Sequence, residues 1–375
     1  MKILHVVPTY LPAVRYGGPI QSVHGLARAQ VGQGHDVQVL TTNIDGDGVS
    51  PVPVDSAVSL DGVEVRYFHS PMLRRLSYAP ALARHLRGNL SRYDVVHLHS
   101  VFLWPTSVAS RLAADVGIPS VLSPRGMLVP ELMRRKSRWV KAAWLALFER
   151  RNLARAAAIH FTSVAEQRDF ERLGLRAQRD AVIPNGVDLP APSPEPREPG
   201  LLVCVGRLSW KKGLDRLIRA LAALPEARLV LAGGDDEGCR HELEHLAAQS
   251  GVAPRVSFTG AVSPEQRDRL LARAQAFVLP SHSENFGNAV AEAMAAGCPV
   301  VVTPQVGLAD TVATAGAGLV SPGDPTALAE ALRRLLGDAA LCVRCGEAGR
   351  RAAREMSWNS VATRMESLYR TIAGA

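Results

Sequence analysis

The sequence predicts an α/β protein built from two Rossmann-like halves, each a doubly wound parallel sheet. Short apolar runs alternate with helix-forming stretches along nearly the whole chain. Proline-dense residues 189–200 interrupt this alternation near the middle of the chain, and the same pattern then begins again. Strands that are separated by helices form parallel sheets with right-handed crossovers, because a parallel pair needs a long connection.

Each predicted strand is a short apolar run bounded by turn residues. In the first half the strands are expected at residues 3–8, 36–41, 63–68, 94–99, 120–123, 158–162 and 181–184, with helices at 20–32, 79–89 and 105–116. In the second half they are expected at residues 201–206, 228–232, 255–258, 276–279, 299–303 and 318–320. A helix at 288–296 stops at Gly297, and a last helix runs from residue 357 to residue 372.

Length and composition fit this two-part organisation. A chain of 375 residues with 47% hydrophobic and 21% charged residues can bury two full cores. We expect a first domain at residues 1–190, a second at 191–356, and a terminal helix at 357–375 that crosses back to the first domain. Five cysteines, an odd number, argue against a disulfide framework and favour a cytoplasmic location. The start of the chain predicts a buried strand and not a signal peptide, and no apolar run is long enough to predict a membrane-spanning helix.

The net charge of +8 lies entirely in the first half. Residues 1–190 contain 23 Lys and Arg against 15 Asp and Glu, and the remaining residues contain 20 of each. The first half is therefore expected to meet an anionic partner, such as a phosphorylated acceptor or an anionic membrane surface. Residues 134–151 predict a basic amphipathic helix for such a surface, with a core-packing helix as the alternative. No RNP, KH or helix-turn-helix pattern supports a nucleic-acid partner.

The stretch at residues 281–302 carries the clearest functional pattern. An apolar strand leads into a short polar loop, and a helix begins near Gly287. Unpaired backbone N–H groups and the positive end of the helix dipole form an anion site there, and a phosphate is its usual occupant. Glu284 in the loop and Glu292 in the helix flank this site, and carboxylates are suited to accept hydrogen bonds from sugar hydroxyls.

A second pattern follows the strand that ends near Val205. Gly206 is followed by two cations, Arg207 and Lys212, in a loop that opens a helix at Gly213. Both cations lie at the carboxyl end of a parallel strand, where ligands bind in open α/β sheets. Such a pair can neutralise a diphosphate in place of a metal ion. No Asp-x-Asp motif stands where it could hold Mg²⁺, so we expect no metal.

Together these motifs resemble the donor-site signature of family 4 of the retaining glycosyltransferases, which have the GT-B fold of two domains facing a central cleft. The resemblance extends over nearly the whole chain and is strongest at residues 206–213 and 281–302. It implies that Arg207 and Lys212 hold the donor diphosphate, and that Glu284 and Glu292 bind the donor sugar and the nucleotide ribose. It further implies that the loop and the first turn of the helix contact the donor through Asn285, Phe286, Gly287, Asn288 and Ala289.

The first domain carries weaker patterns. Gly17 and Gly18 precede the first helix, and by resemblance their backbone approaches the donor diphosphate. His99 ends the fourth strand and matches the active-site histidine of the family, although Ser100 stands where the family often has an acidic residue. Arg125 follows the fifth strand and could clamp an acceptor phosphate or form a structural salt bridge. Ser163 fits both a helix N-cap and an acceptor contact.

The resemblance implies a hexosyltransferase of the retaining, metal-independent type that needs no cofactor besides its nucleotide-sugar co-substrate. The expected partners are a UDP- or GDP-sugar donor and a hydroxyl acceptor, lipid-linked or part of an exopolysaccharide, at the inner face of the plasma membrane. Two alternatives stay open. A sugar-nucleotide epimerase of GT-B fold would convert its substrate without an acceptor. A non-catalytic basic binder of membranes or nucleic acid would not respond to nucleotide sugars.

Overall fold

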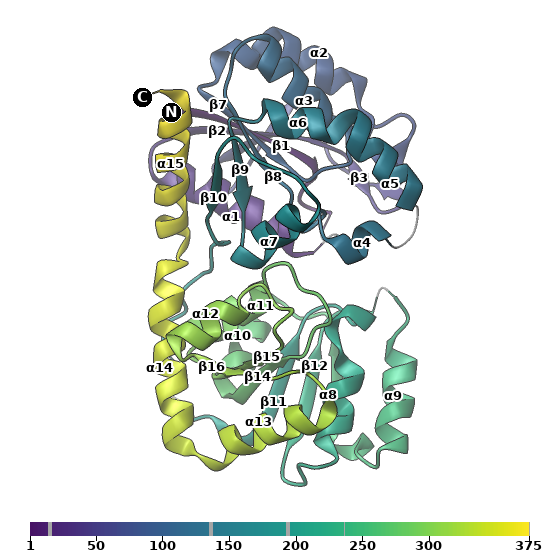
Figure 1. Ribbon diagram of the computed structural model, residues 1–375, viewed down its shortest axis with the longest axis vertical. Helices are drawn as coiled ribbons and strands as arrows, with labels where there is room; N and C mark the ends of the chain where they lie inside the picture. Colours follow the sequence, from purple (N-terminus) through teal and green to yellow (C-terminus); the bar gives the residue numbers. More distant parts are fainter. Residues whose placement is uncertain (14–16, 135–137, 193–195, 236, 375) are drawn as a thin grey trace. The chain divides into compact units, whose positions relative to one another are not determined.

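The computed structural model contains two compact α/β units (Figure 1). Unit 1 comprises residues 1–186 and 358–375, and unit 2 comprises residues 187–357. The structure describes every residue except 14–16, 135–137, 193–195, 236 and 375. Three residues near the start of the predicted basic helix and part of the proline-dense linker therefore lie outside the described residues.

Unit 1 is organised around a sheet of eight strands in the order β10-β9-β8-β7-β1-β2-β6-β5. The strands are β1 (Lys2–Thr9), β2 (Asp36–Thr42), β5 (Ala57–Leu60), β6 (Val63–Phe68), β7 (Val95–His99), β8 (Ser120–Ser123), β9 (Ala158–Phe161) and β10 (Asp180–Val182). All neighbours are parallel except β5, which pairs antiparallel with β6 at the edge. Neither β5 nor the small hairpin of β3 (Ile44–Asp45) and β4 (Gly48–Val49) is predicted from the sequence.

Helices cover both faces of this sheet. They are α1 (Gly18–Gly32), α2 (Pro80–Asn89), α3 (Trp104–Asp115), α4 (Pro130–Arg134), α5 (Arg138–Trp144), α6 (Arg150–Arg155), α7 (Val164–Arg172) and α15 (Trp358–Ala373). Alternate residues of β1 point to the two faces, as the pleat of a strand requires. Leu4 and Val6 lie in one core with α2 and α3, whereas Ile3 and Val7 lie in the other with α1 and α15.

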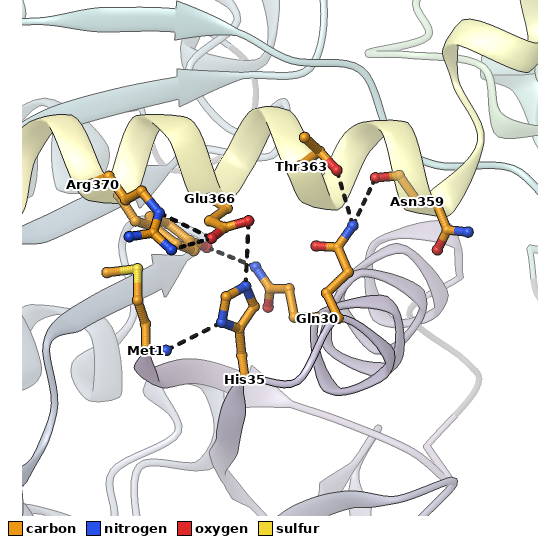
Figure 2. Close-up of polar contacts among 9 residues, drawn as sticks. Met1, Gln30, His35, Asn359, Thr363, Glu366 and Arg370 are labelled. Atoms are coloured by element: carbon orange, nitrogen blue, oxygen red, sulfur yellow. Dashed lines mark hydrogen bonds and ion pairs between the residues drawn. The ribbon is translucent and has the colours of Figure 1, made fainter.

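The last helix, α15, is an integral part of unit 1 (Figure 1). Val361, Met365 and Tyr369 recur at helical spacing and are buried in the same core as Ile3. Polar contacts with α1 and the N-terminus line its edge (Figure 2): the Gln33 amide donates to the Asn359 carbonyl at 3.1 Å and to Thr363 at 3.0 Å. The helix is thus held by apolar and polar contacts along its length.

Unit 2 contains a parallel sheet of six strands in the order β13-β12-β11-β14-β15-β16. The strands are β11 (Glu198–Val205), β12 (Arg228–Ala232), β13 (Val256–Gly260), β14 (Ala274–Leu279), β15 (Val300–Val302) and β16 (Gly318–Val320). The helices are α8 (Leu214–Leu221), α9 (Arg240–Gln249), α10 (Pro264–Arg273), α11 (Asn288–Ala295), α12 (Ala309–Ala315), α13 (Pro325–Gly337) and α14 (Ala339–Glu355). The central strands β11 and β14 are mainly buried and apolar because helices cover both faces of the sheet.

Two elements differ from the sequence-based expectation. Strand β11 begins at Glu198, inside the predicted linker, because Glu198 and Leu202 both pair with β14. The basic segment is helical from residue 138 to residue 155, but a π-helical stretch, η4 (Leu145–Glu149), lies between α5 and α6. The buried carboxylate of Glu149 accepts hydrogen bonds from the Phe102 backbone at 2.7 Å and from the Trp144 indole at 3.0 Å. These internal partners make this stretch part of the fold of unit 1.

Candidate functional site

The sheet topology fixes one ligand-binding edge in each unit. The strand order reverses direction at β11 and β14 in unit 2 and at β1 and β7 in unit 1. The loops that follow the two strands at such a point lead to helices on opposite faces of the sheet, which opens a crevice at the carboxyl ends of these strands. The sequence motifs fall at these points: the Gly206 loop follows β11, the Glu284 loop follows β14, and His99 ends β7.

Close backbone packing shapes the loop after β11. Gly206 adopts φ 143°, and a Cβ added to Gly233 would lie 1.9 Å from the Gly206 oxygen, so only glycine fits there. The side chain of Lys212 passes over Gly206, since a Cβ at Gly206 would lie 3.5 Å from the Lys212 ammonium nitrogen. The ammonium group is therefore held above backbone that carries no side chain of its own. Arg207, the next residue, is exposed at the same loop.

Lys212 forms an ion pair with Glu284 across the switch point of unit 2. Their side chains are 19% and 23% exposed, so the pair is half-buried but open to solvent. The short 3₁₀ turn η5 (Trp210–Lys212) presents the lysine and ends at Gly213 with φ 62°. A Cβ at Gly213 would lie 2.2 Å from the Pro280 oxygen, so this glycine lets the turn pack directly against the end of β14.

Backbone hydrogen bonds hold the Glu284 loop in place. The Glu284 N–H donates to the Gln305 carbonyl at 3.0 Å, and the Gly307 N–H donates to the Glu284 carbonyl at 2.9 Å. The N–H of His282 donates to the Lys211 carbonyl at 2.7 Å, which joins this loop to the lysine turn. Glu284 is thus fixed through its main chain while its carboxylate faces Lys212.

Helix α11 begins beside this ion pair. Its N-cap, Gly287, has φ 99° and, as a glycine, offers no side-chain cap. Phe286 is buried beneath the loop, whereas Asn285, Asn288 and Ala289 are half-buried at its surface. Three features expected from the sequence thus lie on neighbouring segments of one loop cluster. They are the Lys212 ammonium group, the Glu284 carboxylate and a helix start with glycine at its N-cap.

Glu292 lies one turn into α11 and meets a partner that the sequence did not reveal. Its carboxylate accepts a hydrogen bond from Arg267 of α10 at 2.7 Å. Burial raises the pKa of the Glu292 carboxyl to about 7, although Arg267 acts in the opposite direction. A carboxyl with this pKa changes its charge near neutral pH. Arg267 is 25 residues away in sequence, and no local pattern links the two.

Beside this helix, the end of β13 borders a surface hollow of about 290 Å³. Thr259, Ala261 and Val262 line the hollow together with Gln266 and Arg269 of α10. This segment lies in the same unit as the Glu284 loop.

In unit 1, Gly17 and Gly18 form the start of α1 after β1. Gly17 is the N-cap with φ 73°, a conformation that L side chains rarely adopt, and the helix continues through Pro19 in its first turn. As a glycine, Gly17 offers no side-chain cap to this helix start. The glycine pair lies at the β1 switch point, and its contact with the donor diphosphate stays a prediction.

His99 and Arg125 are in direct contact at the ends of β7 and β8. The Arg125 guanidinium donates to His99 Nδ1 at 3.1 Å and to Asn185 Oδ1 at 2.7 Å. His99 is 1% exposed and Arg125 is 9% exposed, and burial lowers the pKa of Arg125 to about 10. The hydrogen bonds satisfy this buried charge only in part, because Arg125 Nε has no hydrogen-bond partner among the described residues, whereas the charge of Glu166 favours the guanidinium.

The backbone around this pair is strained. Ser100 and Phe102 follow β7 with φ 75° and 63°, and Arg125 has φ 56°. Non-glycine residues at positive φ cost free energy and gather at functional sites. The buried Glu166 holds the Arg125 turn, because its carboxylate accepts from the Gly126 N–H at 2.6 Å.

Ser163 serves as the N-cap of α7. Its hydroxyl accepts a hydrogen bond from the Glu166 N–H at 3.1 Å, which is the capping geometry that the sequence pattern predicts. Through Glu166, this cap supports the Arg125 turn.

Four buried histidines, His99 and three others, form a cluster at this end of the sheet. They are His5, His97, His99 and His160, and burial lowers the pKa of each, to about 4 for His5 and about 3 for His160. His5, His97 and His99 could offer three nitrogens to a metal, since these atoms lie within 4.8 Å of one another. Every ring nitrogen of these three already has a hydrogen-bond partner in the protein.

Large apolar side chains are exposed on α5 and η4. Trp139 is 75% exposed, Leu147 is 56% exposed and Phe148 is 47% exposed, and Arg150 and Arg151 follow them at the surface. Among the described residues, no helix has the length and apolar character that crossing a membrane requires.

Comparison with known proteins agrees with this geometry. Residues 17–186 match the family model described as Glycosyl transferase 4-like domain, and residues 188–352 match the model described as Glycosyl transferases group 1. A glycogen synthase of Mycobacterium tuberculosis is 32% identical over 400 residues, covering 98% of this chain and 94% of that protein. A D-inositol 3-phosphate glycosyltransferase of Xylanimonas cellulosilytica is 33% identical over 311 residues, covering 74% of this chain and 72% of that protein.

Solved structures of similar fold cover the whole chain. Sucrose-phosphate synthase from Thermosynechococcus elongatus superposes with a TM-score of 0.82 at 22% identity and covers 100% of both chains. The HepE protein of Anabaena in complex with UDP and glucose gives a TM-score of 0.76 at 22% identity, covering 99% of this chain and 100% of that one. Both units of the chain are Rossmann-like, and the expected fold class is confirmed. The chain therefore belongs to the glycosyltransferases with a GT-B fold.

Proposed function

We propose that this glycosyltransferase transfers a hexose from a nucleotide-diphosphate sugar to a hydroxyl acceptor and retains the anomeric configuration. The observation that carries the proposal is the Lys212–Glu284 ion pair beside the uncapped start of α11. A cation, a carboxylate that accepts hydrogen bonds from sugar hydroxyls and the positive end of a helix dipole are what a sugar diphosphate needs for binding.

Donor binding uses the ion pair as a preformed site. The pyrophosphate takes the place of Glu284 at the Lys212 ammonium, and Arg207 from the same loop adds a second positive charge. The released Glu284 carboxylate accepts hydrogen bonds from hydroxyls of the sugar. Because Lys212 already lies above the side-chain-free backbone of Gly206, the anion can approach the lysine closely.

Contacts beyond the diphosphate fix the rest of the donor. The backbone of residues 287–289 receives phosphate oxygens, with Asn285 and Phe286 shaping the loop. Glu292 accepts hydrogen bonds from the ribose hydroxyls, and Arg267 orients its carboxylate. A UDP- or GDP-hexose is the proposed donor. HepE has been solved with UDP-glucose, and a starch synthase of Arabidopsis thaliana with ADP and acarbose.

The chemical step needs no protein nucleophile. The bond between the anomeric carbon and the diphosphate oxygen breaks, and the acceptor oxygen forms its bond on the same face of the sugar. The acceptor proton passes to the departing phosphate oxygen, so atoms and charge balance. Lys212 and Arg207 stabilise the negative charge that develops on this oxygen, which is the role a metal ion has in other enzymes. We therefore propose a metal-independent reaction without a cofactor.

We assign the acceptor side to unit 1. Arg125 is a buried cation with strained backbone, and it is suited to bind a phosphate or hydroxyl of the acceptor. His99 lies beside Arg125 and is proposed to contact the donor sugar next to the reacting carbon. Gly17 and Gly18 offer backbone N–H groups to the diphosphate. Ser163 caps α7 and thereby supports the Arg125 turn. The acceptor is a growing glycan of an exopolysaccharide or a lipid-linked oligosaccharide.

A lipid-linked acceptor would place the enzyme at the cytoplasmic face of the membrane. The exposed Trp139, Leu147 and Phe148 beside Arg150 and Arg151 are suited to an anionic interface. Sedimentation with vesicles tests this role: binding to phosphatidylcholine vesicles should increase when phosphatidylglycerol is added and be lost in Phe148→Asp. The matched control is Val343→Asp on α14, where Val343 is 60% exposed in unit 2. Equal binding by both variants contradicts membrane docking through this surface.

The decisive experiment combines binding and stereochemistry. Thermal shifts with UDP, GDP, ADP and their hexose derivatives should identify one nucleotide that stabilises the protein. With that donor, transfer should continue in excess EDTA, and proton NMR of the product should show the anomeric configuration of the donor. An inverted product would exclude the retaining reaction, and conversion of the donor sugar without an acceptor would favour the epimerase.

A further inference from the structure

A continuous chain of buried hydrogen bonds runs behind Arg125 and His99 in unit 1. It contains His5, His97, His99, His160, Gln30, Ser123 and Tyr369, which come from six different elements. All seven side chains are buried, and most of these residues are far apart in sequence. Since hydrogen-bond donors and acceptors must alternate along such a chain, its two ends decide where every proton lies.

The Arg125 end fixes the first half of the chain. A guanidinium can only donate, so His99 Nδ1 is an acceptor and the His99 proton lies on Nε2. His99 Nε2–H then donates to His5 Nδ1 at 2.9 Å. His5 in turn carries its proton on Nε2 and donates to the Gln30 amide oxygen at 2.8 Å.

The other end fixes the second half independently. The carbonyl of Ile183 can only accept, so His160 carries its proton on Nε2 and donates at 2.8 Å. His160 Nδ1 therefore accepts from the Ser123 hydroxyl at 2.7 Å. The same hydroxyl accepts from His97 Nε2–H at 2.7 Å, and His97 Nδ1 accepts from the Tyr369 hydroxyl at 2.7 Å.

The two halves join at the contact of Gln30 with Tyr369, where the donor and acceptor roles that they require agree. The Gln30 amide nitrogen donates to the Tyr369 oxygen at 3.4 Å, and this oxygen is free to accept because its own proton goes to His97. This contact sets the orientation of the Gln30 amide, whose oxygen must then face His5. All four histidines are neutral with the proton on Nε2, and the full chain runs in one direction from Arg125 to Ile183.

We propose that Gln30 of α1 and Tyr369 of α15 are positioning residues that fix the tautomer of His99 and thereby hold Arg125 in its place. A reversed Gln30 amide would point N–H at His5 Nε2 and force the His5 proton onto Nδ1. His99 would then have to accept at Nε2 and carry its own proton on Nδ1, facing the donating guanidinium. Two opposed donors would expel Arg125 from the buried position.

The C-terminal helix thus takes part in the site through one hydroxyl group. The roles of His99 and Arg125 in transfer rest on the proposed function, whereas the tautomer of His99 does not. A metal ion held by His5, His97 and His99 would compete with this chain, because it would need three nitrogens that now donate or accept hydrogen bonds.

Two variants test the proposal, and a third serves as the matched control. Gln30→Met removes the acceptor of His5 Nε2–H, and Tyr369→Phe removes the hydroxyl that orients Gln30. The control is Gln33→Met at the C-cap of α1, which removes contacts with Asn359 and Thr363 of α15 but no member of the chain. Far-UV circular dichroism and thermal unfolding check that each variant is folded.

The deciding measurement is NMR of the full chain labelled with ¹⁵N-histidine, with signals assigned from single His→Asn variants. The wild type and Gln33→Met should show His5, His97, His99 and His160 only as the neutral Nε2–H form, at constant shift between about pH 6 and 8. Gln30→Met and Tyr369→Phe should show both tautomers at His99. Turnover in these two should fall roughly tenfold to a hundredfold, with little change in KM for the donor, which unit 2 binds.

Each outcome decides the question. An Nδ1–H form of His99 in the wild type, stoichiometric zinc in the purified protein, or an unchanged His99 tautomer in both folded variants overturns the proposal. If the wild type transfers no sugar, the proposed function fails, and the tautomers alone decide whether Gln30 and Tyr369 position His99.

Discussion

The ammonium group of Lys212 and the carboxylate of Glu284 form an ion pair across the switch point of the unit 2 sheet. The two residues are 72 positions apart, and they belong to two separate sequence motifs. Each motif alone predicts a charge at a strand end. Their contact shows that the two charges lie together, where each partner neutralises the other.

Removing either member of this pair should abolish transfer. Lys212→Ala leaves no ammonium group for the diphosphate, and Glu284→Ala leaves no acceptor for the sugar. Each should lower kcat/KM roughly a hundredfold to a thousandfold. Initial rates with the identified donor measure the effect, and Lys211→Ala, in the same 3₁₀ turn, is the control that should keep nearly full activity. Wild-type rates in Lys212→Ala or Glu284→Ala would refute the assigned roles.

Donor affinity should depend on pH through Glu292. Its carboxyl has a pKa of about 7, so it is largely protonated below that pH and charged above it. A carboxylate accepts ribose hydroxyl groups better than a carboxylic acid does, so affinity should increase as the pH rises through about 7. Calorimetric titration of the nucleotide from about pH 6 to 8 measures this dependence. Glu292→Gln should remove it, whereas Glu265→Gln, an exposed change on α10, should leave it intact.

Acid should destabilise unit 1 through its buried histidines. Their folded pKa values lie below the unfolded value of about 6.5, so the unfolded chain binds more protons between pH 6.5 and about 4. Stability is fully present above pH 6.5 and is lost as the pH falls, by about 1.4 kcal/mol per pH unit for each histidine.

Urea unfolding at several pH values measures this slope for the unit 1 transition. His160→Gln should make the slope shallower by about one proton, and the exposed His69→Gln should leave it unchanged. A slope that is the same in His160→Gln and the wild type would show that His160 is not held neutral in the folded state.

The packing of α15 on α1 should limit the size of the side chain at position 25, which faces Trp358, the first residue of α15. A Cβ at Gly25 of α1 would lie 2.3 Å from the ring of Trp358, so Gly25→Ala must displace this indole. We expect a loss of about 1–3 kcal/mol in the free energy of unfolding. Gly32→Ala in the same helix has open space around its Cβ and should stabilise by about 0.5–1 kcal/mol. Equal effects at both positions in denaturant unfolding would contradict the packing of Trp358 on α1.

Much of the fold follows from local sequence. Strands β1, β2, β6, β12 and β16 begin and end within a residue or two of the predicted limits, because apolar runs bounded by turns specify buried parallel strands. The edge strand β5 was missed, since its alternate residues are only half-buried and its composition resembles a loop. The basic segment expected to be helical at residues 134–151 is helical from residue 138 onward, but its π-helical stretch, which contains the buried Glu149, has no signal in the periodicity.

The sequence by itself determined the two-part α/β organisation and the loops that carry the functional groups. Glycines before Lys212 and at the start of α11 mark these loops, because only glycine permits the positive φ values and the close backbone approach there. The tertiary structure alone decided which side chains meet. Tyr369 reaches His97 across 272 residues, and Arg267 reaches Glu292 from another helix. A buried polar group must find a partner wherever the sheet order brings one, and strand order is set by the packing of the whole unit, which no local spacing encodes.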